Sequence, residues 1–314
     1  ADQVAALAGS RGAPGLRPAK GVHLTVERAR LPCWAAAVLP TPDRRSIFVI
    51  PWGDRVYLGT TDTDHVGPLD EPGCTGDDVA YVLEAANAAL ATPLRPGDVV
   101  GAWAGLRPLV DGARSRRTAD LSRRHCVMTA ANVVTVTGGK LTTYRRMAAD
   151  AVDEVVDLLG RGARRSPTRS LALHGARAGA GGDAGGGAGG EAEPHGEHLA
   201  GRYGGEAHLV VDLVRADPAL GRPLVAGLPY LRAEAVHAAR HEMAHTLDDV
   251  LTRRTRARIL ARHASAAAAP DAARLLAGEL GWSDEQVEQE VAGYRTAVER
   301  ERAAAGLGPA PARR

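Results

Sequence analysis

Residues 175–197 (GARAGAGGDAGGGAGGEAEPHGE) consist almost entirely of glycine, alanine and charged residues, and this segment constrains the fold more than any other. A stretch of this composition buries too little apolar surface to offset the entropy lost on ordering. We therefore interpret it as a flexible linker or a disordered loop. It divides the 314-residue chain into residues 1–174 and a second region over 198–306, and we expect a disordered tail over 307–314.

The region before the linker contains β-prone segments. A short run covers 23–26, and two further runs cover 46–51 and 55–58. The intervening Trp52-Gly53-Asp54 predicts a hairpin with a three-residue turn. Thr75 with a carboxylate at Asp78 has the pattern of a capping box, and it predicts a helix whose apolar face continues to Leu90.

A strand, a glycine turn and a helix are predicted in succession near the end of this region. The strand covers 133–136, the turn covers 137–140, and the helix starts near Thr142 and ends near Gly160. Two adjacent glycines let a backbone approach a ligand closely, and the free N–H groups of a helix start favour an anion. Lys140 adds a positive charge. A phosphate-binding or flavin-binding turn and an ordinary connection both fit this pattern.

Two further residues are candidates for chemistry. Arg107 lies between small and apolar residues in AGLRPL (104–109), where its forked guanidinium suits a phosphate or a carboxylate. A structural salt bridge is the alternative for Arg107. His23, in KGVH (20–23), has the side-chain type of a general base. A half-buried histidine bonded to backbone is the alternative there.

The segments after the linker have helical patterns. Ser283 to Gln286 form a second capping-box pattern, and apolar residues follow it at helical spacing up to Val298. The chain as a whole is therefore predicted to be a mixed α+β protein, with a β-rich first part and a separate α-helical domain over 198–306.

The sequence HEMAH at 241–245 matches the helical zinc-protease pattern HExxH. Three fixed positions in five arise readily by chance. We expect the motif to lie in an arginine-rich surface helix (HAARHEMAHTLDDVLTRRTR, 237–256), which offers no plan for a third ligand. We therefore expect neither a zinc hydrolase nor any other metal site.

Composition and charge narrow the classes of protein. The formal net charge is +2 with 24% charged residues, which does not suggest a nucleic-acid partner. The cysteines Cys33, Cys74 and Cys126 lie far apart without a CxxC spacing, so they predict no disulfide framework and indicate a reducing compartment. No apolar run approaches the roughly 20 residues of a membrane-spanning helix, and no signal peptide is recognisable. These features favour a cytoplasmic location.

Six segments in order resemble the family of FAD-dependent, quinone-linked glycerol-3-phosphate dehydrogenases. The order and spacing of the six are far more specific than any single motif, and together they span nearly the whole chain apart from the linker and the last few residues. The matching segments are KGVH (20–23), FVIPW to GTTDT (48–63), AGLRPL (104–109), Ser122-Arg123, GGKLTTYR (138–145) and EMAHTLDDVLTRRTR (242–256).

The resemblance implies a fold, a reaction and partners. The fold would combine the end of a glutathione-reductase-like FAD domain, a β-rich substrate domain and a C-terminal helical domain. The reaction would be oxidation of sn-glycerol 3-phosphate to dihydroxyacetone phosphate, with a hydride passed to FAD and electrons then passed to membrane quinone. The resemblance is also compatible with a homodimer and with peripheral contact at the inner face of the cytoplasmic membrane.

The matched motifs also imply site residues. His23 and Arg107 would be catalytic, and Lys20, Arg107 and Arg123 would bind the substrate. The flavin-proximal turn would consist of Gly138, Gly139, Lys140, Leu141 and Thr142. The histidines at 241 and 245 lie in a helical-domain signature and would take no part in the chemistry.

The chain departs from the family pattern in one respect. The family carries a GxGxxG fingerprint after its first strand to bind the FAD pyrophosphate, and no such motif follows a strand here. Residues 1–9 resemble a late helix of the FAD domain, so we expect the chain to be the C-terminal part of a longer enzyme. Another FAD-dependent oxidoreductase and a non-catalytic remnant remain the alternatives.

Overall fold

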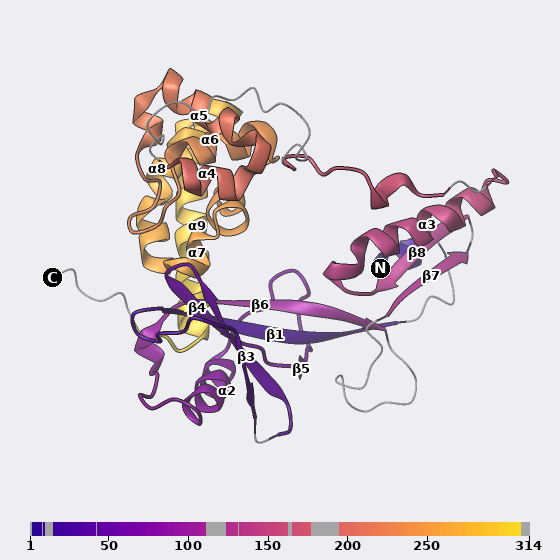
Figure 1. The fold of residues 1–314 in the computed structure, drawn as a ribbon, viewed down its shortest axis with the longest axis horizontal. Coiled ribbons are helices and arrows are strands. Elements are labelled where there is room, and N and C mark those ends of the chain that lie inside the picture. Colours follow the sequence, from indigo (N-terminus) through magenta and orange to yellow (C-terminus); the bar gives the residue numbers. More distant parts are fainter. Residues whose placement is uncertain are drawn as a thin grey trace.

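The computed structural model describes residues 2–7, 9, 15–41, 43–110, 124–130, 132–162, 165–176 and 195–308. An antiparallel sheet with one covering helix, a separate hairpin with its own helix, and a group of helices make up this part of the chain (Figure 1). The mixed α+β fold predicted from the sequence is confirmed. The division into domains at residues 174 and 198 stays a prediction.

Six of the described strands form the larger sheet, in the order β2-β3-β4-β1-β5 with β6 on the other edge of β1. All of the pairings are antiparallel, and β1 pairs with β6 along nearly its whole length. The strands are β1 (Leu16–Glu27), β2 (Ala37–Pro40), β3 (Ser46–Trp52), β4 (Arg55–Gly59), β5 (Thr63–Asp64) and β6 (Val99–Val110).

The predicted hairpin is present, but its turn is shorter than expected. Trp52 pairs with Arg55, so Trp52 belongs to β3 and the turn consists of Gly53 and Asp54 alone. Gly53 has a φ of 55°, a left-handed conformation that glycine adopts without a steric penalty. The three-residue turn of the prediction is therefore wrong by one residue.

One face of the sheet is packed against α2 (Gly76–Asn87), which lies beneath the sheet in Figure 1. The predicted capping box at its start is confirmed, because Thr75 and Asp78 each accept a hydrogen bond from the other's backbone N–H. The buried core between helix and sheet draws alternate residues from the strands. Its central members are Val22, Leu24, Val26, Ile47, Val56, Leu58, Val79, Val82 and Ala86.

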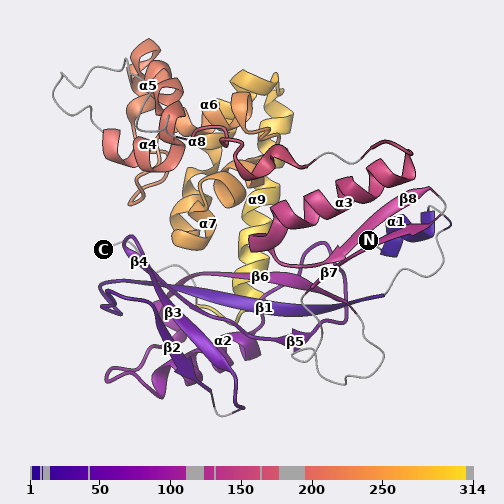
Figure 2. The same ribbon diagram turned by 45° about the vertical axis from the view of Figure 1, so that its right-hand side comes forward.

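The strand, turn and helix predicted near residues 133–160 are also confirmed. β7 (His125–Ala130) and β8 (Val133–Gly138) form a two-stranded hairpin, and α3 (Tyr144–Leu158) packs beside it after a 3-10 turn over Leu141–Thr143. In both views the short helix α1 (Asp2–Leu7) lies next to this hairpin (Figure 1, Figure 2).

The helical part begins at α4 (Gly196–Tyr203) and forms two adjoining cores. Gly175 is attached to this part, since its carbonyl accepts a hydrogen bond from the N–H of Gly205 at 2.9 Å, so the expected linker does not begin there. Residues 177–194 lie outside the described residues. The remaining helices are α5 (Ala207–Ala216), α6 (Arg232–His241), α7 (Ala257–Leu260), α8 (Arg262–Leu280) and α9 (Asp284–Ala304), with a π-helical turn over Asp249–Arg254.

The HEMAH segment does not lie on one helix, contrary to our expectation. α6 ends at His241, and Met243 has a left-handed φ of 54°. The two histidines are therefore not one turn apart on a helical face, which the zinc pattern requires. In the described part of the chain, no group of three or more potential ligands is placed to hold a metal ion.

The helical part is joined to the sheet. α9 runs down to the sheet in both views (Figure 1, Figure 2), and Ala305 and Leu307 at its end are buried in the core between the sheet and α2. The predicted disordered tail is therefore wrong at Leu307, while 309–314 lie outside the described residues. Gly101 of β6 contacts the backbone of Ile259 so closely that a Cβ there would overlap the Ile259 carbonyl.

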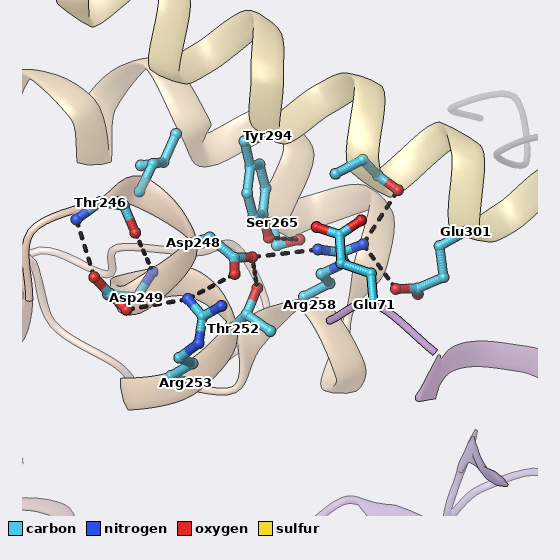
Figure 3. Close-up of polar contacts among 12 residues, drawn as sticks. Glu71, Thr246, Asp248, Asp249, Thr252, Arg253, Arg258, Ser265, Tyr294 and Glu301 are labelled. Carbon is cyan, nitrogen blue, oxygen red and sulfur yellow. Dashed lines mark hydrogen bonds and ion pairs between the residues drawn. The ribbon is translucent and has the colours of Figure 1, made fainter. Parts of the chain in front are cut away.

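A polar network holds the segment between the π-helical turn and α9 (Figure 3). Asp248 accepts from Thr252 at 2.6 Å and is ion-paired with Arg253 at 2.7 Å and with Arg258 at 3.2 Å. Arg258 also pairs with Glu301 of α9 at 2.8 Å. These contacts explain much of the charge in EMAHTLDDVLTRRTR as structural. No helix in the described residues is both long enough and apolar enough to cross a membrane.

Candidate active site

His23 and Arg107 lie on the same face of the sheet, opposite the face that α2 covers. Side chains alternate between the faces of a strand, so His23 shares its face of β1 with Ala19 and Gly21. In the register of β1 and β6, His23 is opposite Trp103 and Ala19 is opposite Arg107. The structure thus brings together the two residues for which the sequence predicted catalytic roles.

Glycine makes room for the Arg107 side chain. The guanidinium lies over Gly21, where a Cβ would come within 2.8 Å of Nη1. Nη1 pairs with Asp62 Oδ1 at 3.3 Å, and Nη2 donates to Thr60 Oγ1 at 3.0 Å and to the Thr61 carbonyl at 3.2 Å. These contacts orient the planar fork, and the Arg107 side chain remains 27% exposed.

The loop that holds Arg107 is itself attached to β1. The backbone N–H of Val22 donates to Thr61 Oγ1 at 3.0 Å, and Thr61 is buried. This loop lies within the GTTDT segment (59–63). The structure gives it the function of positioning the arginine.

His23 lies between an aromatic ring and a glycine. Its ring stacks on Trp103 with 4.9 Å between centroids, and a Cβ at Gly59 would come within 2.7 Å of His23 Cδ2. Burial, and secondarily the positive charge of Arg107, lower the pKa of His23 below its ordinary value. Both effects disfavour the imidazolium, so His23 is neutral near pH 7 and has the protonation state of a general base.

Lys20 does not join these residues. It shares its face of β1 with the core residue Val22, and its ammonium pairs with Asp78 of α2 at 2.6 Å and donates to the Gly73 carbonyl at 3.3 Å. The Lys20 and Asp78 side chains are only 13% and 6% exposed. We therefore correct the expectation that Lys20 binds substrate: its contacts join α2 to the sheet.

The glycine turn follows β8 and approaches the end of β6. Gly138 and Gly139 have φ values of 70° and 86°, so other residues would be strained there. A Cβ on Gly138 would also come within 2.7 Å of Val110 Cγ2, and one on Gly139 would meet the Met147 side chain. Glycine is therefore favoured at both positions for two reasons: the left-handed backbone conformation and the lack of space for a Cβ.

The residues after the two glycines are accessible. Lys140, Leu141 and Thr142 are exposed, and Leu141 is 88% exposed. Thr143 Oγ1 donates to the Lys140 carbonyl at 3.0 Å, which fixes the first turn before α3. The turn thus presents a cation and a helix start outward, as a ligand site requires.

The remaining predicted site residue, Arg123, lies outside the described residues. Sequence reasoning missed Trp103, Thr60 and Asp62 as parts of the site. Trp103 is four residues before Arg107, so the two side chains lie on the same face of β6. This spacing would have indicated Trp103 if residues 99–110 had been predicted as a strand.

Comparisons with known proteins show what this chain is similar to. Residues 1–145 match the family model described as FAD dependent oxidoreductase, and residues 166–287 match that of the C-terminal domain of alpha-glycerophosphate oxidase. Glycerol-3-phosphate dehydrogenase 2 of Mycobacterium tuberculosis is 39% identical over 305 residues, which are 96% of this chain and 52% of the relative. A probable mitochondrial glycerol-3-phosphate dehydrogenase of Caenorhabditis elegans is 33% identical over 92% of this chain and 41% of its own length.

A solved structure is similar over the whole chain. The glycerol-3-phosphate dehydrogenase of Bacillus halodurans, complexed with FAD, superposes with a TM-score of 0.75 at 26% identity, covering 100% of this chain and 62% of its own. These matches show that the chain is similar to part of the FAD-dependent oxidoreductases. Within that class, the relatives named here are glycerol-3-phosphate dehydrogenases. The chain spans about half the length of the curated relatives it matches.

Proposed function

We propose that this chain supplies the substrate-binding and flavin-proximal part of an enzyme that oxidises sn-glycerol 3-phosphate to dihydroxyacetone phosphate with FAD. The observation that carries the proposal is the pairing of a neutral His23 with a partly exposed Arg107 on one face of the sheet. A phosphate ester with an oxidisable hydroxyl needs both an anion-binding group and a base, and this face offers both.

Each residue has a defined task in this proposal. Arg107 binds the substrate phosphate through its guanidinium, held in position by Asp62 and Thr60. His23 accepts the proton of the substrate C2 hydroxyl on a ring nitrogen, for which the described residues contribute no hydrogen-bond partner. Stacking on Trp103 keeps the imidazole plane fixed. Arg123 stays a proposed second phosphate ligand.

The glycine turn fits a flavin edge. The left-handed Gly138 and Gly139 allow a close approach of backbone, and Lys140 with the helix start favours the negative charge of a reduced ring. FAD, when bound, supplies the acceptor for the hydride from C2. The sequence has no GxGxxG after a strand, so in this proposal residues outside these 314 hold the pyrophosphate.

The electron acceptor, the location and the oligomeric state are proposed from the similarity to glycerol-3-phosphate dehydrogenases. Electrons would pass to membrane quinone, the enzyme would lie in the cytoplasm or peripherally on the inner face of the membrane, and a homodimer is compatible with this reading.

Replacing Arg107 tests the proposal. The test protein is a chimera that joins this chain to the half of the Mycobacterium tuberculosis relative that the chain does not match. Arg107→Lys keeps the charge but loses the fork, and charge-assisted bonds are worth roughly 1.5–3 kcal/mol, so KM should rise about tenfold or more. Arg17→Lys, an exchange of the same kind on β1, is the control. Unchanged kinetics for Arg107→Lys would reject the assignment.

A further inference from the structure

A cavity of about 650 Å³ lies between the tip of the β3–β4 hairpin and the helical part. Its lining includes Trp52 and Arg55 from the hairpin and Tyr230 from the loop before α6. Arg254, the last residue of the π-helical turn, and Arg256, two residues further on, also line it. The volume is in the range of small-molecule sites. His23 and Arg107 do not line this cavity.

The cavity is strongly cationic. Five arginines line it, against the carboxylates of Asp54 and Glu242. Two of the five are neutralised: Arg202 by the buried Glu234 at 2.8 Å, and Arg253 by Asp248 at 2.7 Å (Figure 3). The other three, Arg55, Arg254 and Arg256, have different partners.

Two of the remaining three arginines are bound mainly to backbone carbonyls. Arg55 donates to the Leu260 carbonyl at 2.8 Å. Arg254 donates to the Glu242 carbonyl at 3.1 Å, and its ion pair with Asp249 is long at 3.7 Å. A carbonyl orients a guanidinium without cancelling its charge. Among the described residues, Arg256 has no carboxylate within ion-pair distance, and its guanidinium lies 5.3 Å from the Trp52 ring centroid.

The backbone at Arg256 is unusual as well. Its φ is 56°, a left-handed conformation that a non-glycine residue adopts at a cost of roughly 1–3 kcal/mol. The preceding Thr255 is fully buried and donates its hydroxyl to the Val250 carbonyl at 2.7 Å. The fold therefore holds Arg256 toward the cavity by fixing its neighbour. Such outliers concentrate at binding sites.

We propose that this cavity binds a small molecule bearing a phosphate group, with Arg254 and Arg256 as its main ligands. Tyr57 stacks on the Trp52 ring at 5.6 Å between centroids, and the Arg256 guanidinium lies over the same ring. The lining carries more guanidinium groups than carboxylates, so charge defines the ligand. Guanidinium forks match the oxygens of a phosphate in pairs.

Calorimetric titration of the 314-residue chain with pyrophosphate, in buffer free of phosphate, tests the proposal. We expect saturable binding of one pyrophosphate per chain. Arg256→Gln and Arg254→Gln should each raise the Kd at least tenfold. Arg256 is exposed, so its replacement leaves the fold intact even if Arg254→Gln does not. Arg274→Gln removes the same charge from an exposed position of α8 that does not line the cavity, and it should bind like the parent.

Three results would overturn the proposal: no saturable binding, an equal loss in Arg274→Gln, or unchanged affinity in Arg256→Gln. Citrate at the same ionic strength separates a phosphate site from a general anion site. Binding of citrate as tight as that of pyrophosphate would also contradict the assignment to phosphate. Melting curves of each variant, followed by circular dichroism, show whether a loss of binding reflects unfolding.

Discussion

Replacing Lys20 by methionine separates a structural role for this residue from a role in substrate binding. Methionine has a similar length but no charge, so the substitution leaves Asp78 without its ammonium partner. The pair is buried, with a distance of 2.6 Å and side chains 13% and 6% exposed. Removing one partner of such a pair typically costs about 3–5 kcal/mol, because the remaining charge stays buried.

The cost at this site should lie at the lower end of that range. Asp78 Oδ2 keeps two other hydrogen bonds, from the Thr75 backbone N–H at 2.9 Å and from the Thr75 hydroxyl at 2.7 Å. We expect the free energy of unfolding to fall by about 3 kcal/mol. Urea unfolding of the 314-residue chain measures it. In a double-mutant cycle with Asp78→Asn, the two effects should be far from additive.

Kinetics complete this test. In the chimera, Lys20→Met should leave the KM for sn-glycerol 3-phosphate unchanged, because Lys20 faces α2 and not His23. A loss of stability below about 1 kcal/mol would show that the ion pair is not the structural contact described. A tenfold rise in KM with intact stability would return Lys20 to the substrate site.

Two further predictions concern the sheet. Gly101→Ala should lower the free energy of unfolding in urea by about 3 kcal/mol, because its Cβ would overlap the Ile259 backbone. Gly105→Ala is the control, since a Cβ there has open space around it, and it should change stability little. Equal effects of the two substitutions would contradict this packing. The rate of flavin reduction in the chimera should fall only as the pH drops below about 6.5, since burial and Arg107 lower the pKa of His23. Arg107→Gln should move this acidic limb of the pH profile to higher pH. An acidic limb that His23→Ala leaves unchanged would exclude His23 as the base.

The sequence predicted the local features that depend on a few neighbouring residues. Both capping boxes, at Thr75 and Ser283, form as expected, and the glycine turn at 138–139 lies between a strand and a helix. Each capping box, for example, is formed by hydrogen bonds between two residues three positions apart. The correct residue types are therefore sufficient to recognise them.

The long pair of strands β1 and β6 was not predictable in the same way. Pro18, Gly21, Gly105 and Pro108 normally argue against strand interiors. In the structure the prolines are directly opposite each other, as are the glycines, so the missing donors and side chains coincide at the same levels of the ladder. Such compensation depends on register, and so does the proximity of His23 to Arg107.

The prediction for Lys20 was wrong for a related reason. KGVH suggested one functional cluster, but residues three apart on a strand face opposite sides. The resemblance to a family identified the motif, and only the strand geometry separated its two polar residues. The HEMAH segment was misjudged as helical because Met243 gives no sequence sign of its left-handed backbone.

Visible absorbance spectra of the purified proteins test the central claim, that the turn after β8 forms the near side of a flavin site shared with His23 and Arg107. The 314-residue chain should purify colourless and inactive. The chimera should be yellow and lose its flavin absorbance when sn-glycerol 3-phosphate is added without oxygen, and Lys140→Ala should weaken flavin binding or slow this bleaching. A yellow, active 314-residue protein, or a chimera indifferent to Lys140→Ala, would contradict the account.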